Sequence, residues 1–205
     1  MSQPGYHAVV DQPAGLRERK KQATREALHR AALRLVRERG LDQVTVEAIA
    51  DAAGVSRRTF SNYFSSKEEA LLHGEQMRMR LLVEIVHARP ADETYWAALI
   101  GAVGEFTARV GVEHPGWREE IRPIRGEPAA LARQVAVHAE MERELAAELV
   151  RRMPAGPDAE LRARLMAGVF LTTLRITLRQ WLHQPDGPFA PLLRQALEIV
   201  RERFD

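Results

Sequence analysis

The chain has 205 residues, of which 45% are hydrophobic and 28% charged, and this composition is ordinary for a globular protein of one or two domains. It contains no cysteine, so disulfide bonds and thiolate metal sites are excluded. The polar N-terminus lacks the apolar core of a signal peptide, and no run approaches the roughly 18 apolar residues of a membrane-spanning helix. We therefore expect a cytoplasmic protein with no membrane contact.

The net charge of +2 is unevenly distributed along the chain. Residues 16–64 hold 11 Lys and Arg against 6 Asp and Glu, a net charge of +5. Residues 65–205 carry a net charge of −2, and Asp11 supplies the remaining −1. A basic segment in a nearly neutral chain is the electrostatic signature of a domain that binds a polyanion such as DNA.

The chain begins with residues 1–15, which contain two Pro and two Gly and are expected to form a disordered arm. A first helix is predicted from Leu16 to Arg39, with Gly40 as its C-terminal stop. Its predicted buried stripe consists of Leu28, Ala32 and Leu35. Its start carries four cations: Arg17, Arg19, Lys20 and Lys21. Cations there oppose the helix dipole, so a phosphate partner would explain them, with a solvated basic surface as the alternative.

The stretch from Val44 to Leu71 predicts a helix-turn-helix. Thr45 can cap a short first helix and Ser56 can cap a second, because each hydroxyl can accept a hydrogen bond from a first-turn amide. Gly54 lies between the two helices, where a left-handed residue costs least. The apolar face of the first helix consists of Val46, Ile49, Ala50 and Ala53.

The second helix of this pair is polar and basic on its outer side. Phe60 and Phe64 supply its inward face, and Ser66 with Glu69 can form a capping box for the helix that follows. The other side chains can meet phosphates or base edges: Arg57, Arg58, Thr59, Ser61 and Asn62. Such a helix is suited to the major groove of DNA.

Residues 17–73 resemble the DNA-binding domain of TetR/AcrR-type transcriptional regulators. The resemblance rests on three segments that agree in order and spacing: TREALHRAALRLVRERG, VTVEAIADAAGVS and RRTFSNYF-SSKEEALL. Two positions depart from the family pattern, because Arg58 stands where Gly or a small residue is common and Ser61 where Tyr is common. Losing that Tyr removes a usual phosphate contact, which Arg58 can replace, or Arg58 can add a base contact.

The candidate DNA-contacting residues come from the start of the first helix and from the helix-turn-helix. They are Arg17, Lys20, Lys21, Thr45, Ser56, Arg57, Arg58, Thr59, Asn62, Tyr63 and Lys67. Arg57 and Arg58 can bind guanine O6 and N7 through two hydrogen bonds, or contact phosphates only. Asn62 can pair with adenine or cap the turn. The resemblance implies phosphate contacts for Tyr63 and Lys67.

The remaining chain is predicted to form a second helical domain, so that the domains cover residues 16–75 and 76–205. Helices are expected over residues 67–88, 92–110, 129–153, 158–183 and 189–204, with a short helix near 117–121. The predicted buried face of the third of these contains Leu131, Val135, His138, Leu145 and Leu149. No segment has the two-residue period of a strand. The sequence predicts an all-α protein of about nine helices, with an N-terminal three-helix DNA-binding domain and a C-terminal ligand-binding and dimerisation domain.

The helix over residues 158–183 is apolar on two faces. One face contains Ala167, Leu171, Leu174, Leu178 and Trp181, and the opposite side is assigned Met166, Val169, Phe170 and Ile176. A helix that is apolar nearly all round must be buried all round. We expect a second copy of the chain to cover it in a four-helix bundle, with burial inside one subunit as the alternative. The resemblance implies the same homodimer, which would bind an inverted-repeat operator in double-stranded DNA.

The resemblance also implies an effector pocket enclosed by the middle helices. Its wall candidates, for each of which plain hydrophobic core is the favoured alternative, are Trp96, Val103, Phe106, Met141, Phe170 and Thr173. His138 can orient a ligand or be a satisfied core residue. Arg175, if buried, needs a partner, which can be an acidic ligand or a carboxylate at the dimer interface. Three further arginines can meet a phosphate-bearing ligand or form a solvated face: Arg118, Arg122 and Arg125.

The segment RRTFSNYF also resembles an acyl-CoA-sensing, mycofactocin-regulator-like branch of the family, which implies a small hydrophobic or acyl-type effector. The chain lacks H-E-x-x-H, G-x-S-x-G, P-loop and G-x-G-x-x-G motifs, and its H-x-E at residues 138–140 lacks the paired cysteines of a zinc deaminase. We predict no enzyme activity, cofactor or metal. The predicted function is a repressor released by its effector; the alternatives are a regulator without an effector, or an activator.

Overall fold

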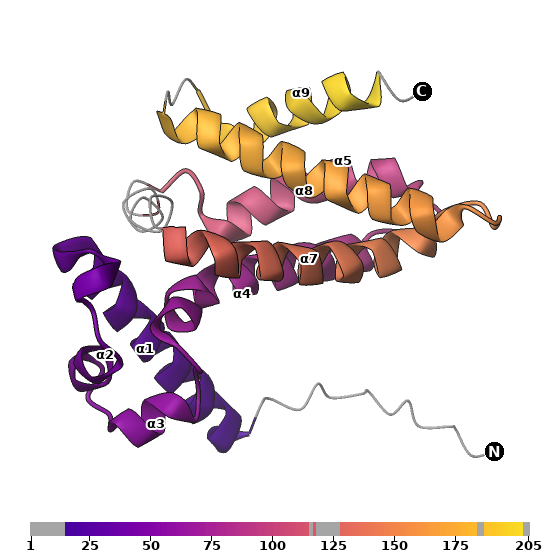
Figure 1. The fold of residues 1–205 in the computed structure, drawn as a ribbon. Helices are drawn as coiled ribbons and strands as arrows, with labels where there is room; N and C mark the ends of the chain where they lie inside the picture. The colour runs from indigo at the N-terminus through magenta and orange to yellow at the C-terminus, as the bar shows by residue number, and fades with distance from the viewer. Residues whose placement is uncertain (1–14, 115–116, 118–127, 184–186, 203–205) are drawn as a thin grey trace, which may run out of the picture. The chain divides into compact units, whose positions relative to one another are not determined.

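The computed structural model describes residues 15–114, 117, 128–183 and 187–202. Within these ranges the chain forms eight α-helices and one 3-10 helix and no strand, which confirms the all-α fold class. The chain divides into two compact units, residues 1–67 and 68–205 (Figure 1). The predicted N-terminal arm and most of the helix predicted near 117–121 lie outside the described residues. The same is true of three arginines that were considered for a ligand: Arg118, Arg122 and Arg125.

The first unit contains the predicted helix-turn-helix. Helix α1 (Leu16–Arg39) has the predicted bounds, and it ends where Gly40 adopts a positive φ of 79°. A 3-10 turn (Leu41–Gln43) leads to α2 (Val46–Ala52), and α3 (Arg57–Ser61) follows. Helix α1 packs on α2, and α2 packs on α3.

Side-chain caps define the start of both short helices. The Ala48 N–H donates to Thr45 Oγ1 at 3.1 Å, and the Thr59 N–H donates to Ser56 Oγ at 3.0 Å, so both predicted caps are confirmed. Gly54, between the helices, has the left-handed φ of 71° that a glycine adopts without steric cost. These contacts fix the turn that presents α3.

The inward face of α3 is also as predicted. Phe60 and Phe64 are buried, with their ring centroids 5.8 Å apart. They share the interior of the first unit with the buried side chains Leu28, Ala32, Leu35, Ile49 and Ala50. Because the apolar side of α3 is committed to this interior, its polar side is left exposed.

The second unit is built from five long helices. They are α4 (Lys67–Ala88), α5 (Tyr95–Val110), α7 (Pro128–Val150), α8 (Ala159–His183) and α9 (Phe189–Arg201). Helix α4 has the predicted bounds, and it begins at the last residue of the first unit. Helix α8 packs between α7 and α9, and α9 also packs on α5 (Figure 1).

Three of these helices end or begin about three residues inside their predicted bounds: α5, α7 and α9, the last of which ends at Arg201 instead of residue 204. For the first two the reasons are local. Helix α5 begins three residues late because Thr94 caps it, accepting a hydrogen bond from the Ala97 N–H at 3.2 Å. Helix α7 ends at Val150, three residues before the predicted Met153, and a turn leads to Pro154. Proline disfavours helical backbone at the preceding residue, so the helix cannot run up to it.

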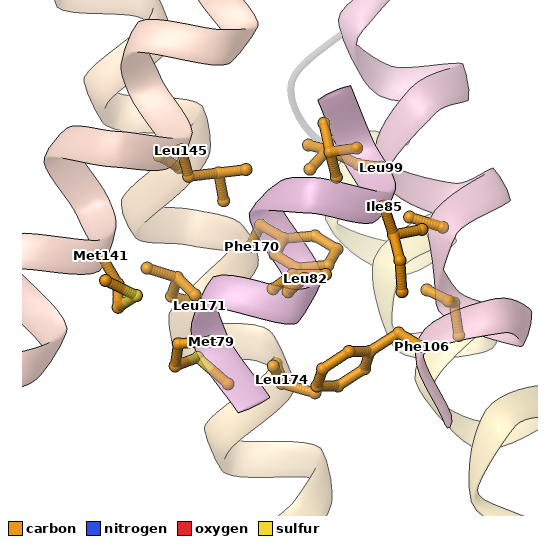
Figure 2. Packing of buried hydrophobic residues seen from close by; sticks show 14 of the residues in the cluster. Met79, Leu82, Ile85, Leu99, Phe106, Met141, Leu145, Phe170, Leu171 and Leu174 are labelled. Carbon is orange, nitrogen blue, oxygen red and sulfur yellow. The ribbon is translucent and has the colours of Figure 1, made fainter. Parts of the chain in front are cut away.

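One apolar core joins all five helices of the second unit. Helix α4 contributes Leu82 and Ile85, α5 contributes Leu99, α7 contributes Leu145, and α8 contributes Phe170 (Figure 2). Trp181 near the end of α8 stacks on Phe189 with centroids 5.4 Å apart, and its indole N–H donates to the Gly187 carbonyl at 2.9 Å.

Two residues lie on faces other than those predicted. Phe170 is buried in the same cluster as Ala167 and Leu174, three and four residues away, because those spacings return to one side of a helix. Val135 is 65% exposed, because the buried side of α7 instead consists of Val137, Met141, Leu145 and Leu149. Helix α8 nevertheless keeps a second apolar side exposed, at Leu161, Leu165 and Ile176.

Candidate nucleic-acid interface and apolar cavity

The exposed side of α3 carries the candidate base-reading residues. Arg57, Arg58 and Asn62 are exposed and Thr59 is half-buried. Arg57 Nε lies 3.0 Å from Glu47 Oε1, which holds its guanidinium against α2. Both partners are largely exposed, and such surface ion pairs contribute only about 0–1 kcal/mol. A nucleic acid can therefore replace Glu47 as the partner of Arg57 at little cost.

The structure brings cations of α1 next to the end of α3. Arg17, Lys20 and Lys21 line one open concave surface with Thr59, Asn62 and Tyr63, and this surface encloses about 730 Å³. Leu16 and Thr24 also line it, and the described lining residues include no carboxylate. Six predicted DNA contacts, separated by about forty residues in sequence, thus share one basic surface.

Arg25 supports this surface and was missed from the sequence. Its guanidinium carbon lies 5.9 Å from the ring centroids of both Tyr63 and Phe64. A cation over an aromatic face is attracted by the ring quadrupole, so Arg25 helps to hold the ring of Tyr63 in place. The only sequence signal was its position, one helical turn after the cluster at the start of α1.

The hydroxyls of Thr45 and Ser56 are occupied by the caps described above, and Ser56 Oγ also lies 2.8 Å from Thr59 Oγ1. The Lys67 ammonium donates to the carbonyls of Leu41 at 2.8 Å and Val44 at 2.9 Å, and its side chain is half-buried. Lys67 therefore ties the start of α4 to the entrance of α2. This structural role was missed from the sequence, and one ammonium proton remains for a phosphate.

The second unit contains a small apolar cavity of about 60 Å³. Its deep wall is made of buried side chains: Met79, Phe106, Val112, Trp117, Leu171, Leu174 and Phe189. Figure 2 shows Leu174 lying between Met79 and Phe106. The rim holds Val110, Leu178 and four ionisable side chains, Glu75, Arg78, His138 and Arg175.

A half-buried pair crosses the rim from α4 to α7. His138 Nε2 lies 3.0 Å from Glu75 Oε1, and the two side chains are 29% and 15% exposed. The guanidinium carbon of Arg78 lies 5.9 Å from the ring centroid of Trp117. Arg175 is exposed and lies at the opening. The described rim of the cavity thus holds three basic side chains and one carboxylate, and the rest of the cavity wall is apolar.

Of the eight predicted pocket residues, the structure brings three to this cavity: Phe106, His138 and Arg175. Val103, Met141 and Phe170 are packed into the core without lining it. Thr173 donates its hydroxyl to the Val169 carbonyl at 2.8 Å and lines a groove on the outside of α8. Among the wall residues that were missed, Glu75, Arg78 and Met79 come from α4, a helix to which no pocket residue had been assigned.

Trp96 lies at a different groove, of about 960 Å³, beside the start of α5. The groove is also lined by Tyr95, Met166, Arg162 and the pair Arg89–Glu93. The hydrogen bond from the Arg89 guanidinium holds the pKa of the Glu93 carboxyl below its ordinary value. The pair is a local i,i+4 contact at the start of the helix.

No helix within the described ranges is long and apolar enough to cross a membrane. Among the same residues, no three His, Asp or Glu side chains are grouped closely enough to hold a metal ion.

Both units match known family models. Residues 28–73 match the model described as bacterial regulatory proteins, tetR family, and this range contains α2, α3 and the predicted base-reading side chains. Residues 93–205 match the MftR C-terminal domain, which is more than half of the chain.

Three relatives extend this likeness over most of the chain. The HTH-type transcriptional regulator TcmR of Streptomyces glaucescens is 33% identical over 91% of this chain and 87% of its own. The putative mycofactocin biosynthesis transcriptional regulator MftR of Mycobacterium tuberculosis is 24% identical over 91% and 94%. The crystal structure of Thermus thermophilus FadR, a TetR-family repressor in complex with lauroyl-CoA, has a TM-score of 0.53 and 25% identity over 87% and 93%. With its helix-turn-helix and MftR-type second domain, this chain belongs to the tetR family of bacterial transcriptional regulators.

Proposed function

We propose that this regulator is a repressor, and not an enzyme, that binds an inverted-repeat operator in the cytoplasm as a homodimer and is released by a small hydrophobic or acyl-type effector. Residues 16–75 form the DNA-binding domain and residues 76–205 the ligand-binding and dimerisation domain. The main support is the single basic surface that joins Arg17, Lys20 and Lys21 to the end of α3. Such a surface can hold the phosphate backbone while Arg57 and Arg58 reach the groove.

The exposed side of α8 supports the dimer. Leu161, Leu165 and Ile176 are more than half exposed, although they lie on the same helix as the core residues Phe170 and Leu174. Large apolar side chains that recur on one exposed helix face mark an interaction surface. A second copy covers this face with its own α8, and two-fold symmetry then presents two recognition helices to the two halves of an operator.

The apolar cavity supports an effector. Pockets for small molecules enclose about 300–1,000 Å³, whereas this cavity encloses about 60 Å³. An effector can therefore enter only if the surrounding helices or side chains move. The occupied and empty forms then differ in shape, which gives the effector the unequal affinity for two states that a switch requires. The lauroyl-CoA bound to the Thermus relative makes a long-chain acyl-CoA the first compound to test.

The proposed function is tested by selecting bound sequences from random DNA with the full chain and then adding lauroyl-CoA. We expect the selected site to be an inverted repeat and the complex to dissociate in the presence of the compound. If the selected sequences are not inverted repeats, or if binding is independent of sequence, the proposed inverted-repeat operator is contradicted. Stable binding in the presence of every acyl compound supports the alternative of a regulator without such an effector. A reporter gene placed behind the selected operator distinguishes repression from activation.

A further inference from the structure

We propose that the Glu75–His138 pair is the specificity element of the cavity: it selects amphiphiles with an anionic head group, and such a head group takes the place of the Glu75 carboxylate on His138. The inference rests on the proposed function, in which this cavity receives the effector. The inference further specifies that the effector is anionic and that the Glu75–His138 pair recognises its charge.

The charge of the rim favours an anion. Arg78, His138 and Arg175 lie at the opening, and among the described residues that line the cavity Glu75 is the sole carboxylate. Its side chain is only 15% exposed and lies 3.0 Å from the His138 ring nitrogen. Charged hydrogen bonds gain strength as water is excluded. The carboxylate of Glu75 therefore occupies the position that the head group of an amphiphile would take.

A second, open groove adjoins the cavity at His138. This groove of about 480 Å³ between α7 and α8 is lined by Val135, Ala139, Glu142 and Thr172. The groove and the cavity share three lining residues: His138, Leu171 and Arg175. These side chains therefore separate the two spaces. An apolar chain inserted among Met79, Phe106 and Leu174 places its head group beside His138 and Arg175. The bulk of a larger head group is then accommodated by the groove.

Replacing Glu75 changes a contact between two helices. Glu75 lies on α4 and His138 on α7, so the pair joins these helices across the opening. An anion that binds His138 competes with Glu75 and repels it, which breaks one of the contacts between α4 and α7. Because α4 continues the chain directly from the helix-turn-helix, loss of this contact alters the equilibrium between DNA-binding and non-binding states.

The test compares four compounds with the same ten-carbon chain: decanoate, decyl phosphate, decanol and decylammonium. Calorimetry measures their binding to the full-length protein, and fluorescence anisotropy measures their release of a labelled operator. We expect the two anions to bind and to act at roughly tenfold lower concentration than decanol, and decylammonium to be the weakest. Comparison of the affinities of decanoate and decyl phosphate shows whether the site prefers a carboxylate or a phosphate head group.

Two variants of Glu75 give the inference a second readout. Glu75→Ala removes the competing carboxylate, so anions should bind severalfold more tightly while the operator binds more weakly. Glu75→Gln keeps the volume and removes only the charge, and it should tighten anion binding even if the Ala variant folds poorly. The matched control is His87→Gln, which breaks the other His–Glu pair between α4 and α7, His87 Nδ1 to Glu148 Oε2 at 2.9 Å, away from the cavity. It should retain wild-type selectivity.

The inference is overturned if decanol or decylammonium is as potent as the two anions. It is also overturned if Glu75→Gln binds the anions no more tightly than the control His87→Gln does. Anion-selective binding without release of the operator overturns the effector-released function and leaves the assigned specificity standing. Absence of anion binding by calorimetry overturns the inference, even if lauroyl-CoA releases the operator.

Discussion

Arg57 and Arg58 are adjacent in sequence but have different surroundings. Arg57 is held by Glu47 on α2, whereas no ion pair to Arg58 occurs in the described part of the chain. Helical geometry also turns the two side chains about 100° apart. Arg57 must exchange this weak ion pair for a contact with DNA, whereas Arg58 has no described ion pair to give up. The two residues are therefore expected to have different effects on the selected operator.

The prediction for this pair is made with single substitutions. Arg57→Ala should cost roughly 1–3 kcal/mol of operator binding and relax one position of the selected sequence, as the loss of a bidentate guanine contact does. A phosphate-only residue instead weakens all sequences alike and lowers the salt slope by about one. Arg58→Gly tests the residue that departs from the family pattern.

Arg109→Ala serves as the control, because Arg109 is an exposed cation on α5 and its loss changes the net charge equally. Salt-dependent affinity and a repeated sequence selection are the measurements. An unchanged selected sequence in both Arg57→Ala and Arg58→Gly would show that neither arginine reads bases.

Lys67 illustrates how one residue can have a structural role and a predicted binding role. Lys67→Met retains most of the aliphatic chain but loses both hydrogen bonds to the carbonyls of Leu41 and Val44. We expect the free energy of unfolding to fall by about 1.5–3 kcal/mol, since charged hydrogen bonds are involved. Urea unfolding monitored by circular dichroism measures it. Lys21→Met, at an exposed site, should change stability by less than about 0.5 kcal/mol yet weaken DNA binding. Equal stabilities of the two variants would contradict the structural role of Lys67.

At the scale of elements, the exposed side of α8 carries the dimer prediction. Leu165→Glu with Ile176→Glu places two charges where a second copy must pack, and the protein should become monomeric in light scattering. Operator affinity should then fall by about 10²–10⁴-fold, because a monomer holds only one half-site. Met77→Gln, which changes a 40% exposed apolar residue on α4, should remain dimeric. A dimer that survives both α8 substitutions would place the interface elsewhere.

The helices were predictable from sequence, because caps, glycines and prolines are local signals. Gly40 ends α1 and Ser56 starts α3 through bonds to neighbouring residues. The faces of the long apolar helices were harder to predict. Phe170 was assigned the wrong side because a helix with apolar residues nearly all round does not reveal which side meets the core. Val135 was assigned the wrong side because Val135 and Val137 lie on opposite sides of α7, and the spacing to Leu145 and Leu149 suits either one.

The grouping of cations beside α3 could be predicted from the sequence, and the wall of the cavity largely could not. Cations and a capped basic helix are visible as composition and spacing, and six of the predicted residues share one surface. The cavity depends on where five helices converge, and a sequence does not encode that place locally. Glu75 and Arg78 were missed because the predicted pocket was enclosed by the middle helices and no wall residue was assigned to α4.

At the scale of the whole molecule, DNA binding and effector binding are expected to be coupled through two global states. The cavity of about 60 Å³ must widen to admit an acyl chain, so the effector favours the wider state. If it prefers that state a hundredfold, the coupling free energy is about 2.7 kcal/mol, within the usual range for allosteric proteins. The operator must then weaken effector binding by the same factor, because linkage is reciprocal.

Calorimetry of lauroyl-CoA binding, with and without a saturating operator duplex, measures this reciprocity. We expect the dissociation constant for lauroyl-CoA to rise by the factor by which lauroyl-CoA raises the dissociation constant for the operator. A duplex of scrambled sequence is the control and should leave the titration unchanged. Equal affinities with and without operator would exclude a two-state switch, even if the compound binds in the cavity.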